Sequence, residues 1–143
     1  MKIKTIFQRP ILILIMLTSL ILVSCLKIKE DKIDGQWIRV KMWDIDPQYK
    51  EYWTFSDNVV TVEKEKDTLS ADSVLTRIRV LYDDAEYSVS KTINHTYVQI
   101  TGFTMDEYYT YNKKWQVIDL DKETFSLATS AGTGLIYLEF YND

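Results

Sequence analysis

From Gly35 onward, short runs rich in Val, Ile, Thr, Tyr, Phe and Trp recur about every ten residues, and Asp, Asn, Lys or Gly separates them. Runs of this kind predict β-strands, and their regular spacing is typical of an all-β domain. In several runs, apolar and polar positions alternate, as in Ile136, Leu138 and Phe140, which predicts one buried and one exposed face. The predicted strands are 37–43, 51–56, 59–65, 75–82, 86–92, 96–102, 107–111, 115–120, 125–130 and 135–141.

The connections between these runs are short and favour antiparallel pairing of consecutive strands. A sheet of eight to ten strands keeps two raw edges unless it closes on itself, and closure alone removes them. The sequence therefore predicts an all-β fold, an antiparallel up-and-down β-barrel of eight to ten strands, with a β-sandwich as the alternative. The longest polar connection, 66–74, is predicted to be a loop or a short helical turn. The predicted turns are 56–58, 83–84, 113–114, 121–123 and 131–134.

The N-terminal residues have the order of a secretory signal. Lys2, Lys4 and Arg9 precede an apolar run over 11–23, which matches the charged and hydrophobic regions of a signal peptide. The run has about thirteen residues, whereas a helix needs roughly twenty to cross the hydrocarbon layer. We therefore predict that residues 1–24 are a cleavable signal peptide and not a permanent transmembrane helix.

The end of this run, Leu22-Val23-Ser24-Cys25, resembles the lipobox of bacterial lipoproteins, in which a small residue precedes an obligatory cysteine. The resemblance implies that Cys25 takes a diacylglycerol on its sulfur and becomes the first residue of the mature protein. Two or three acyl chains hold a protein to a membrane, because each buried methylene contributes about 0.8 kcal/mol. A plain signal peptide with an incidental cysteine is the alternative. Cys25 is the only cysteine of the chain, so no intramolecular disulfide forms.

Residues 25–34 are charged and lack periodicity, which predicts a lipidated tether in front of a barrel domain at 35–143. Within it, Lys29-Glu30-Asp31 resembles the signal that sends lipoproteins of Bacteroidota to the cell surface. We expect an outer-membrane protein, lipid-anchored on the periplasmic face or at the cell surface; a merely soluble tether is the alternative for this motif. Without the three basic residues of the signal, 14 basic residues oppose 21 acidic ones, and this net charge of about −7 disfavours nucleic acid as a partner.

The start of the domain, Gly35-Gln36-Trp37, resembles the Gly-x-Trp of lipocalins and the wider calycin group, and it lies close behind the tether as it does there. The run 52–58 and the closing strands after Trp115 also look like those of small lipocalin-like lipoproteins of Bacteroidota. The resemblance implies that Trp37 closes one end of the barrel. An arginine of the last strand packs over this tryptophan in the family, whereas this chain has Glu139 there and no arginine after Arg79.

Eighteen aromatic residues remain after the predicted cleavage site. Aromatic rings form large apolar walls of ligand pockets, but they also fill cores. We expect a barrel that binds a small apolar or amphipathic ligand without catalysis. The alternative is a protein-binding lipoprotein, an inhibitor or an accessory subunit of a surface complex, which uses outward tyrosines of the run 108–111 and Tyr97. The candidate ligand contacts are Trp43, Trp53, Phe55, Tyr97 and Trp115.

The sequence does not predict an enzyme, a metal site or a cofactor. His95 is the only histidine and lies in a predicted exposed turn, so neither a Cys-His nucleophile nor a multi-histidine metal site is available. The acidic pairs at 44 and 46, 83 and 84, and 106 and 107 are interpreted as solvated turn residues. Thr68 and Ser73 lie in triplets that resemble O-glycosylation sites of Bacteroidota, which leaves their modification open.

Overall fold

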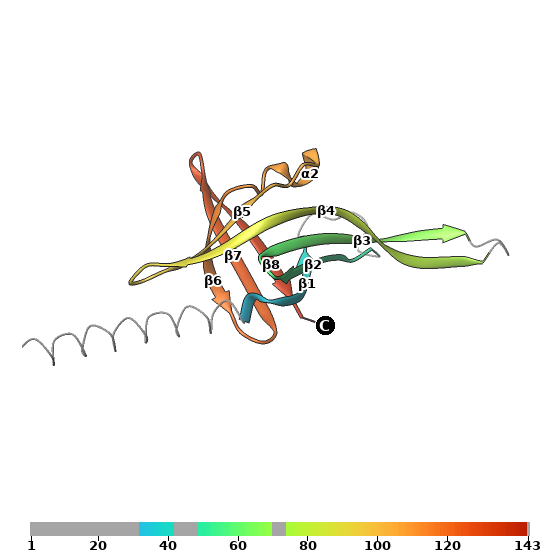
Figure 1. Ribbon diagram of the computed structural model, residues 1–143, viewed down its shortest axis with the longest axis horizontal. Helices are drawn as coiled ribbons and strands as arrows, with labels where there is room; N and C mark the ends of the chain where they lie inside the picture. Colours follow the sequence, from blue (N-terminus) through green and yellow to red (C-terminus); the bar gives the residue numbers. More distant parts are fainter. Residues whose placement is uncertain (1–31, 42–48, 70–73, 143) are drawn as a thin grey trace, which may run out of the picture. The chain divides into compact units, whose positions relative to one another are not determined.

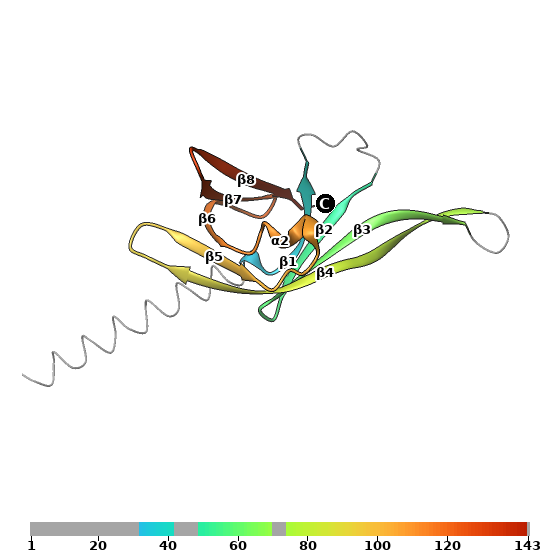
Figure 2. The ribbon, with the colours of Figure 1, turned by 90° about the horizontal axis from the view of Figure 1, so that it is seen from above.

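The computed structural model describes residues 32–41, 49–69 and 74–142, which belong to one compact unit of the chain. Eight antiparallel strands follow one another around a closed barrel, and each pairs with its neighbours in sequence (Figures 1 and 2). A short helix, α2, lies between the fifth and sixth strands. The elements are β1 (Gly35–Val40), β2 (Glu51–Ser56), β3 (Val59–Leu69), β4 (Leu75–Lys91), β5 (Thr96–Thr101), α2 (Asp106–Tyr109), β6 (Lys114–Leu120), β7 (Thr124–Ala131) and β8 (Gly134–Tyr141).

The last strand closes the barrel by pairing with the first. Ile38, Arg39 and Val40 of β1 lie opposite Tyr141, Phe140 and Glu139 of β8. The predicted antiparallel up-and-down barrel is therefore confirmed, with eight strands, and the β-sandwich alternative is wrong.

The turn between β2 and β3 has the chemistry of a tight hairpin. Asp57 and Asn58 adopt φ angles of 52° and 64°, which suit a two-residue type I′ turn that follows the twist of the flanking strands. The later turn after β6 uses a side chain instead, because the Asp121 carboxylate accepts hydrogen bonds from the backbone N–H groups of Glu123 and Thr124, both at 2.7 Å. The predicted turns at 56–58 and 121–123 are confirmed.

The predicted turn at 83–84 is wrong, because β4 runs through it as one strand from Leu75 to Lys91. The pairing with β3 changes register between Val62 and Glu63, so the chain absorbs an extra residue as a β-bulge. Asp83 is also not solvated as predicted, since only 6% of it is exposed. Its carboxylate faces the segment before α2 and accepts hydrogen bonds from the backbone N–H groups of Thr104 and Met105 at 2.9 and 2.8 Å.

The predicted strand at 107–111 is also wrong, because α2 and a turn occupy this segment. Asp106 and Glu107 lie in the first turn of α2, where negative charge suits the helix dipole. Tyr108 is fully buried, whereas Tyr109 is 66% exposed. The alternation expected of a strand is therefore replaced by a helical turn that directs one tyrosine into the barrel.

The predicted loop at 66–74 is strand over residues 66–69, whereas 70–73 lie outside the described residues. β3 continues to Leu69 and pairs with β4 down to Leu75. In the described residues, β3 pairs with β2 only as far as Lys64, and β5 joins β4 only from Glu86 onward. The remainder forms a two-stranded extension, which we call the arm (65–69 and 75–79), and it projects well beyond the other strands in both views (Figures 1 and 2).

The interior of the barrel is filled by aromatic and aliphatic side chains. Phe55 packs edge-to-face against Phe125 with ring centroids 5.7 Å apart, and Phe125 stacks on Phe140 at 5.4 Å. Such pairs add to the free energy of burial. The fully or nearly fully buried core consists of Ile33, Trp37, Trp53, Phe55, Val60, Val62, Ala85, Tyr87, Val98, Ile100, Phe103, Tyr108, Trp115, Phe125, Leu127, Leu138 and Phe140.

Candidate functional site

The residues predicted to contact a ligand do not share one surface. Trp53, Phe55 and Trp115 are fully buried in the core, whereas Tyr97 lies on the outside of the barrel and lines a groove there. Trp43 lies outside the described residues, as do Cys25, Ser73 and the acidic pair at 44 and 46. Thr68 is in β3, opposite Thr76, and is partly exposed.

Trp37 is a core residue at the beginning of β1. It is 3% exposed, and its ring centroid lies 5.4 Å from that of Phe125. Its indole N–H donates a 2.8 Å hydrogen bond to the carbonyl of Ile33, which ties the segment before β1 to the barrel. No arginine stacks on Trp37 in the described residues; Arg39 stacks instead on Tyr111, 4.7 Å from its centroid.

A buried carboxylate, Glu51, lies within 3.0 Å of polar atoms of four side chains, and Lys64 Nζ follows at 3.9 Å. Only 2% of it is exposed. One oxygen accepts hydrogen bonds from Arg39 Nη1 at 3.0 Å and Trp53 Nε1 at 2.7 Å. The other accepts from Tyr108 Oη at 2.9 Å and lies 2.8 Å from Lys41 Nζ. We call Glu51 and the four nearer residues the Glu51 cluster; its bonds connect β1, β2 and α2.

The pKa shifts within the Glu51 cluster keep Glu51 ionised and Tyr108 protonated at neutral pH. Burial disfavours the ionised form of Glu51, but the attraction of Arg39 and the hydrogen bonds from Lys41 and Trp53 outweigh it and lower the pKa of Glu51. Burial, together with the neighbouring Glu51 charge, raises the pKa of Tyr108 far above its ordinary value. Tyr108 therefore stays protonated and donates to Glu51. Both carboxylate oxygens are occupied by donors of the chain itself, which suits a structural ion network.

Sequence reasoning missed Glu51, although a signal was present. Side chains two residues apart in a strand point to the same face, so Glu51 shares its face with Trp53 and Phe55. A carboxylate on the most aromatic face of the sheet needs buried partners. The sequence does not identify these partners, because Tyr108 contacts Glu51 from α2, a helix that the sequence pattern does not predict.

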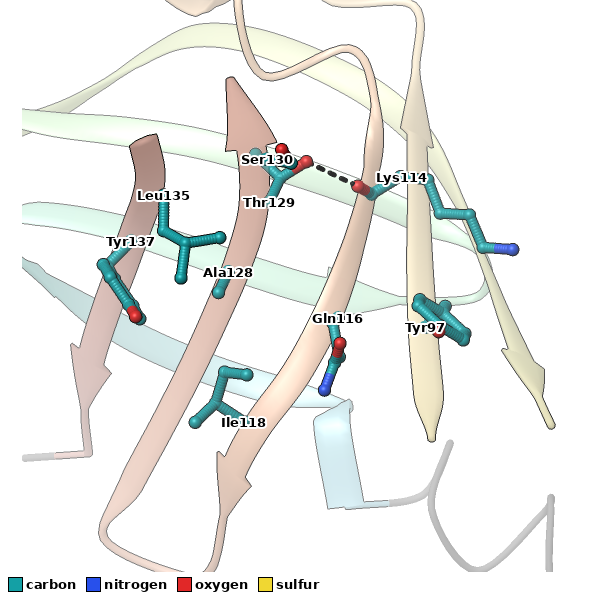
Figure 3. Close-up of a pocket in the computed structure, with 9 residues that line it drawn as sticks. All are labelled: Tyr97, Lys114, Gln116, Ile118, Ala128, Thr129, Ser130, Leu135 and Tyr137. Carbon is teal, nitrogen blue, oxygen red and sulfur yellow. Dashed lines mark hydrogen bonds between the residues drawn. The ribbon is translucent and has the colours of Figure 1, made fainter. Parts of the chain in front are cut away.

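The outer side of the barrel holds a groove with a volume of about 410 Å³ across β5 to β8 (Figure 3). Ala128 of β7 forms its floor. Leu135 and Tyr137 of β8 flank the floor on one side, and Gln116 of β6 flanks it on the other, with Tyr97 of β5 beyond it. This volume lies within the range of roughly 300–1,000 Å³ found for small-molecule sites.

The end of the arm exposes a second apolar surface. Leu69 and Leu75 are cross-strand partners and are 70% and 66% exposed. Nearer the barrel the arm is braced by polar contacts, since the Tyr52 hydroxyl donates to Glu65 at 2.8 Å and the Arg79 guanidinium lies 3.6 Å from the centroid of the Tyr52 ring. The brace holds the two leucines away from the core.

The remaining candidates for chemistry are isolated. His95 is exposed in the turn after β4, as predicted, and its Nδ1 lies 3.1 Å from Gln116 Nε2. Within residues 32–41, 49–69 and 74–142, no three side chains of His, Cys, Asp or Glu come together in a way that could hold a metal ion. None of the described helices has the length and apolar character to cross a membrane.

Comparison of the chain with models of protein families, with curated protein sequences and with solved structures found no match. The class of the domain, a closed eight-stranded up-and-down barrel, is defined by its own strand order and pairing.

Proposed function

We propose that this chain is a non-enzymatic lipoprotein of the outer membrane whose lipocalin-like barrel binds a protein of the cell envelope through the arm. The lipobox-like segment before Cys25 supports the anchor, and the charged residues that follow it support a tether. The partner is an envelope protein with an apolar recess, and the barrel acts as its inhibitor or accessory subunit.

The observation that carries the proposal is the exposed pair of leucines on a braced arm. A two-stranded hairpin alone is at best marginally stable in water, yet this one extends five residue pairs beyond the shared barrel strands and ends in Leu69 and Leu75. Large apolar side chains at the end of a projecting element mark an interaction site.

The packing of the interior supports a site on the outside over one in the barrel. Trp53 contacts Phe103 and Phe140 with ring centroids 5.4 Å apart in both pairs. A guest among these rings would have to displace side chains that are fully buried, at a cost of several kcal/mol each.

The anchor is tested by replacing Cys25 in the full chain. Cys25→Ala removes the sulfur that takes the lipid, so we expect loss of labelling by a radioactive fatty acid and accumulation of the unprocessed precursor. Unchanged labelling would contradict the proposed anchor.

The arm is tested by capture of partners from envelope extracts with the full lipidated chain. The double variant Leu69→Ser, Leu75→Ser removes two side chains that the partner would bury. Each buried leucine contributes at least about 1.5 kcal/mol to binding, so the affinity should fall more than roughly 100-fold. Ile93→Ser is the matched control, because Ile93 is 98% exposed but lies in the turn between β4 and β5. The proposal predicts a partner that both the unmodified chain and the Ile93→Ser variant capture and the double variant does not. A partner retained by the double variant, or none at all, would refute it.

A further inference from the structure

We propose that the outer groove over β7 is a binding site for a short saccharide, a function separate from that of the arm. The groove joins two tyrosine rings, an oriented amide and a small-residue floor on one face of the sheet (Figure 3). Its volume of about 410 Å³ suits a small ligand.

The aromatic residues provide the surfaces for stacking. Tyr137 is 54% exposed at one side of the groove. Tyr97 lies at the other side, partly buried, and Lys114 Nζ is 4.3 Å from its ring centroid. The face of an aromatic ring is electron-rich, and the apolar face of a sugar ring presents C–H groups with partial positive charge. Two separated tyrosines therefore suit a ligand with sugar rings better than one with a flexible alkyl chain.

Polar groups between the tyrosines provide hydrogen bonds. The Gln116 amide is oriented by its 3.1 Å contact with His95 Nδ1. Ser130 lies two residues after Ala128 in β7, on the same face of the strand, and adds a hydroxyl that both donates and accepts. Sugar hydroxyls donate and accept, and they match such a combination of amide and hydroxyl groups.

The charge of the groove differs from that of the whole chain. The sequence has 21 acidic residues and a net charge of −4, but no acidic residue lines the groove, and Lys114 is its charged member. The site therefore accepts a neutral or an anionic saccharide without local repulsion.

The pairing of the strands disfavours an extended peptide as the ligand. β6 and β7 are paired with each other, and β7 is paired with β8 along its whole length, from Thr124 opposite Tyr141 to Ala131 opposite Gly134. A peptide that adds to a sheet needs an open strand edge, and the floor of this groove is the middle of the sheet. Recognition must come from side chains, as it does for sugars.

The experiment is a binding screen of the full lipidated chain in detergent against an array of neutral and acidic oligosaccharides: cellotetraose, maltotetraose, chitotetraose, oligogalacturonate and oligoalginate. Each hit is then measured by isothermal titration calorimetry. Tyr137→Ala and Tyr97→Ala should each weaken binding at least tenfold, and Ala128→Leu should do the same by filling the floor while keeping both tyrosines. Lys114→Gln should weaken acidic saccharides only.

Tyr109→Ala is the matched control, because Tyr109 is 66% exposed on α2 and does not line the groove; it should bind as the unmodified chain does. Thermal unfolding of every variant confirms that the barrel is intact. The inference is overturned if no saccharide binds, or if binding survives in folded Tyr137→Ala and Ala128→Leu variants. Because the arm residues are unchanged in these variants, their capture of a protein partner tests the proposed function independently.

Discussion

Replacement of Glu51 by Gln tests whether the Glu51 cluster stabilises the barrel. The substitution keeps the size of the side chain but removes the charge that holds Arg39 and Lys41 at 3.0 and 2.8 Å. A net contribution of roughly 1.5–3 kcal/mol per hydrogen bond to a charged group, and losses of about 3–5 kcal/mol when one partner of a buried ion pair is removed, give an expected destabilisation of about 3 kcal/mol. For a domain of this size, the melting temperature should fall by roughly 10 °C.

The measurement is urea unfolding at neutral pH, followed by tryptophan fluorescence, because Trp53 lies within the Glu51 cluster. Glu139→Gln is the control, because Glu139 is an exposed residue of β8 outside the Glu51 cluster, and surface substitutions usually change the unfolding free energy by less than about 0.5 kcal/mol. The reasoning is refuted if the Glu51→Gln variant unfolds within about 0.5 kcal/mol of the unmodified chain, the ordinary range for surface substitutions.

The pH dependence gives a second readout of the same variant. The pKa of Glu51 is lower in the folded than in the unfolded state, so its contribution is complete above the unfolded-state value of about 4.3 and is lost as the pH falls through the folded-state value. The difference in unfolding free energy between the unmodified chain and Glu51→Gln should therefore be constant near neutral pH and narrow in acid. A difference that widens below pH ~4 would contradict the direction of the shift.

Two further substitutions test the contacts that the sequence did not reveal. Asp83→Asn should destabilise the barrel by about 1.5–3 kcal/mol in urea unfolding. The amide loses the charge, and its NH2 group replaces the oxygen that accepts from the Asp84 backbone N–H and the Thr104 hydroxyl. The exposed neighbour Asp84→Asn is its control, and equal effects would argue against the assigned role. Trp53→Phe should cost about 2–3 kcal/mol, since it removes buried volume and the 2.7 Å hydrogen bond to Glu51; a melting temperature unchanged in calorimetry would show that neither contact matters.

The β-strand pattern was predictable from the sequence wherever a strand has one wet and one buried face. β2 and β6 to β8 lie within a residue of their predicted bounds, because alternation and turn residues agree there. The same reasoning wrongly predicts a turn at 83–84, in the middle of β4, because adjacent aspartates favour turns. Only the tertiary position of Asp83, beside the amides of Thr104 and Met105, explains why the strand continues.

The candidate sites were harder to predict from the sequence than the strands. The sequence predicts Tyr97 as an outward tyrosine, and Tyr97 does line the groove, but the sequence does not single out its counterpart Tyr137. The two are forty residues apart in the sequence, and only the order of β5 to β8 around the barrel places them on one face. A site built from side chains of four strands depends on closure and register, which the pattern of a single strand does not contain.

The arm also leaves one strand edge open. In the described part of the chain, no other strand pairs with the outer edge of β4 between Leu75 and Asp84, and open edges are templates for polymerisation. Arg77 and Arg79 lie along this edge, while Lys66 lies on the partner strand. Pairing of two such β4 edges in antiparallel register about Ile78 would set Arg77 of one copy against Arg79 of the other, and like charges directly opposite each other are destabilising. In this register the two arginines therefore disfavour pairing of two arms edge to edge, even though the arm carries exposed leucines at its end.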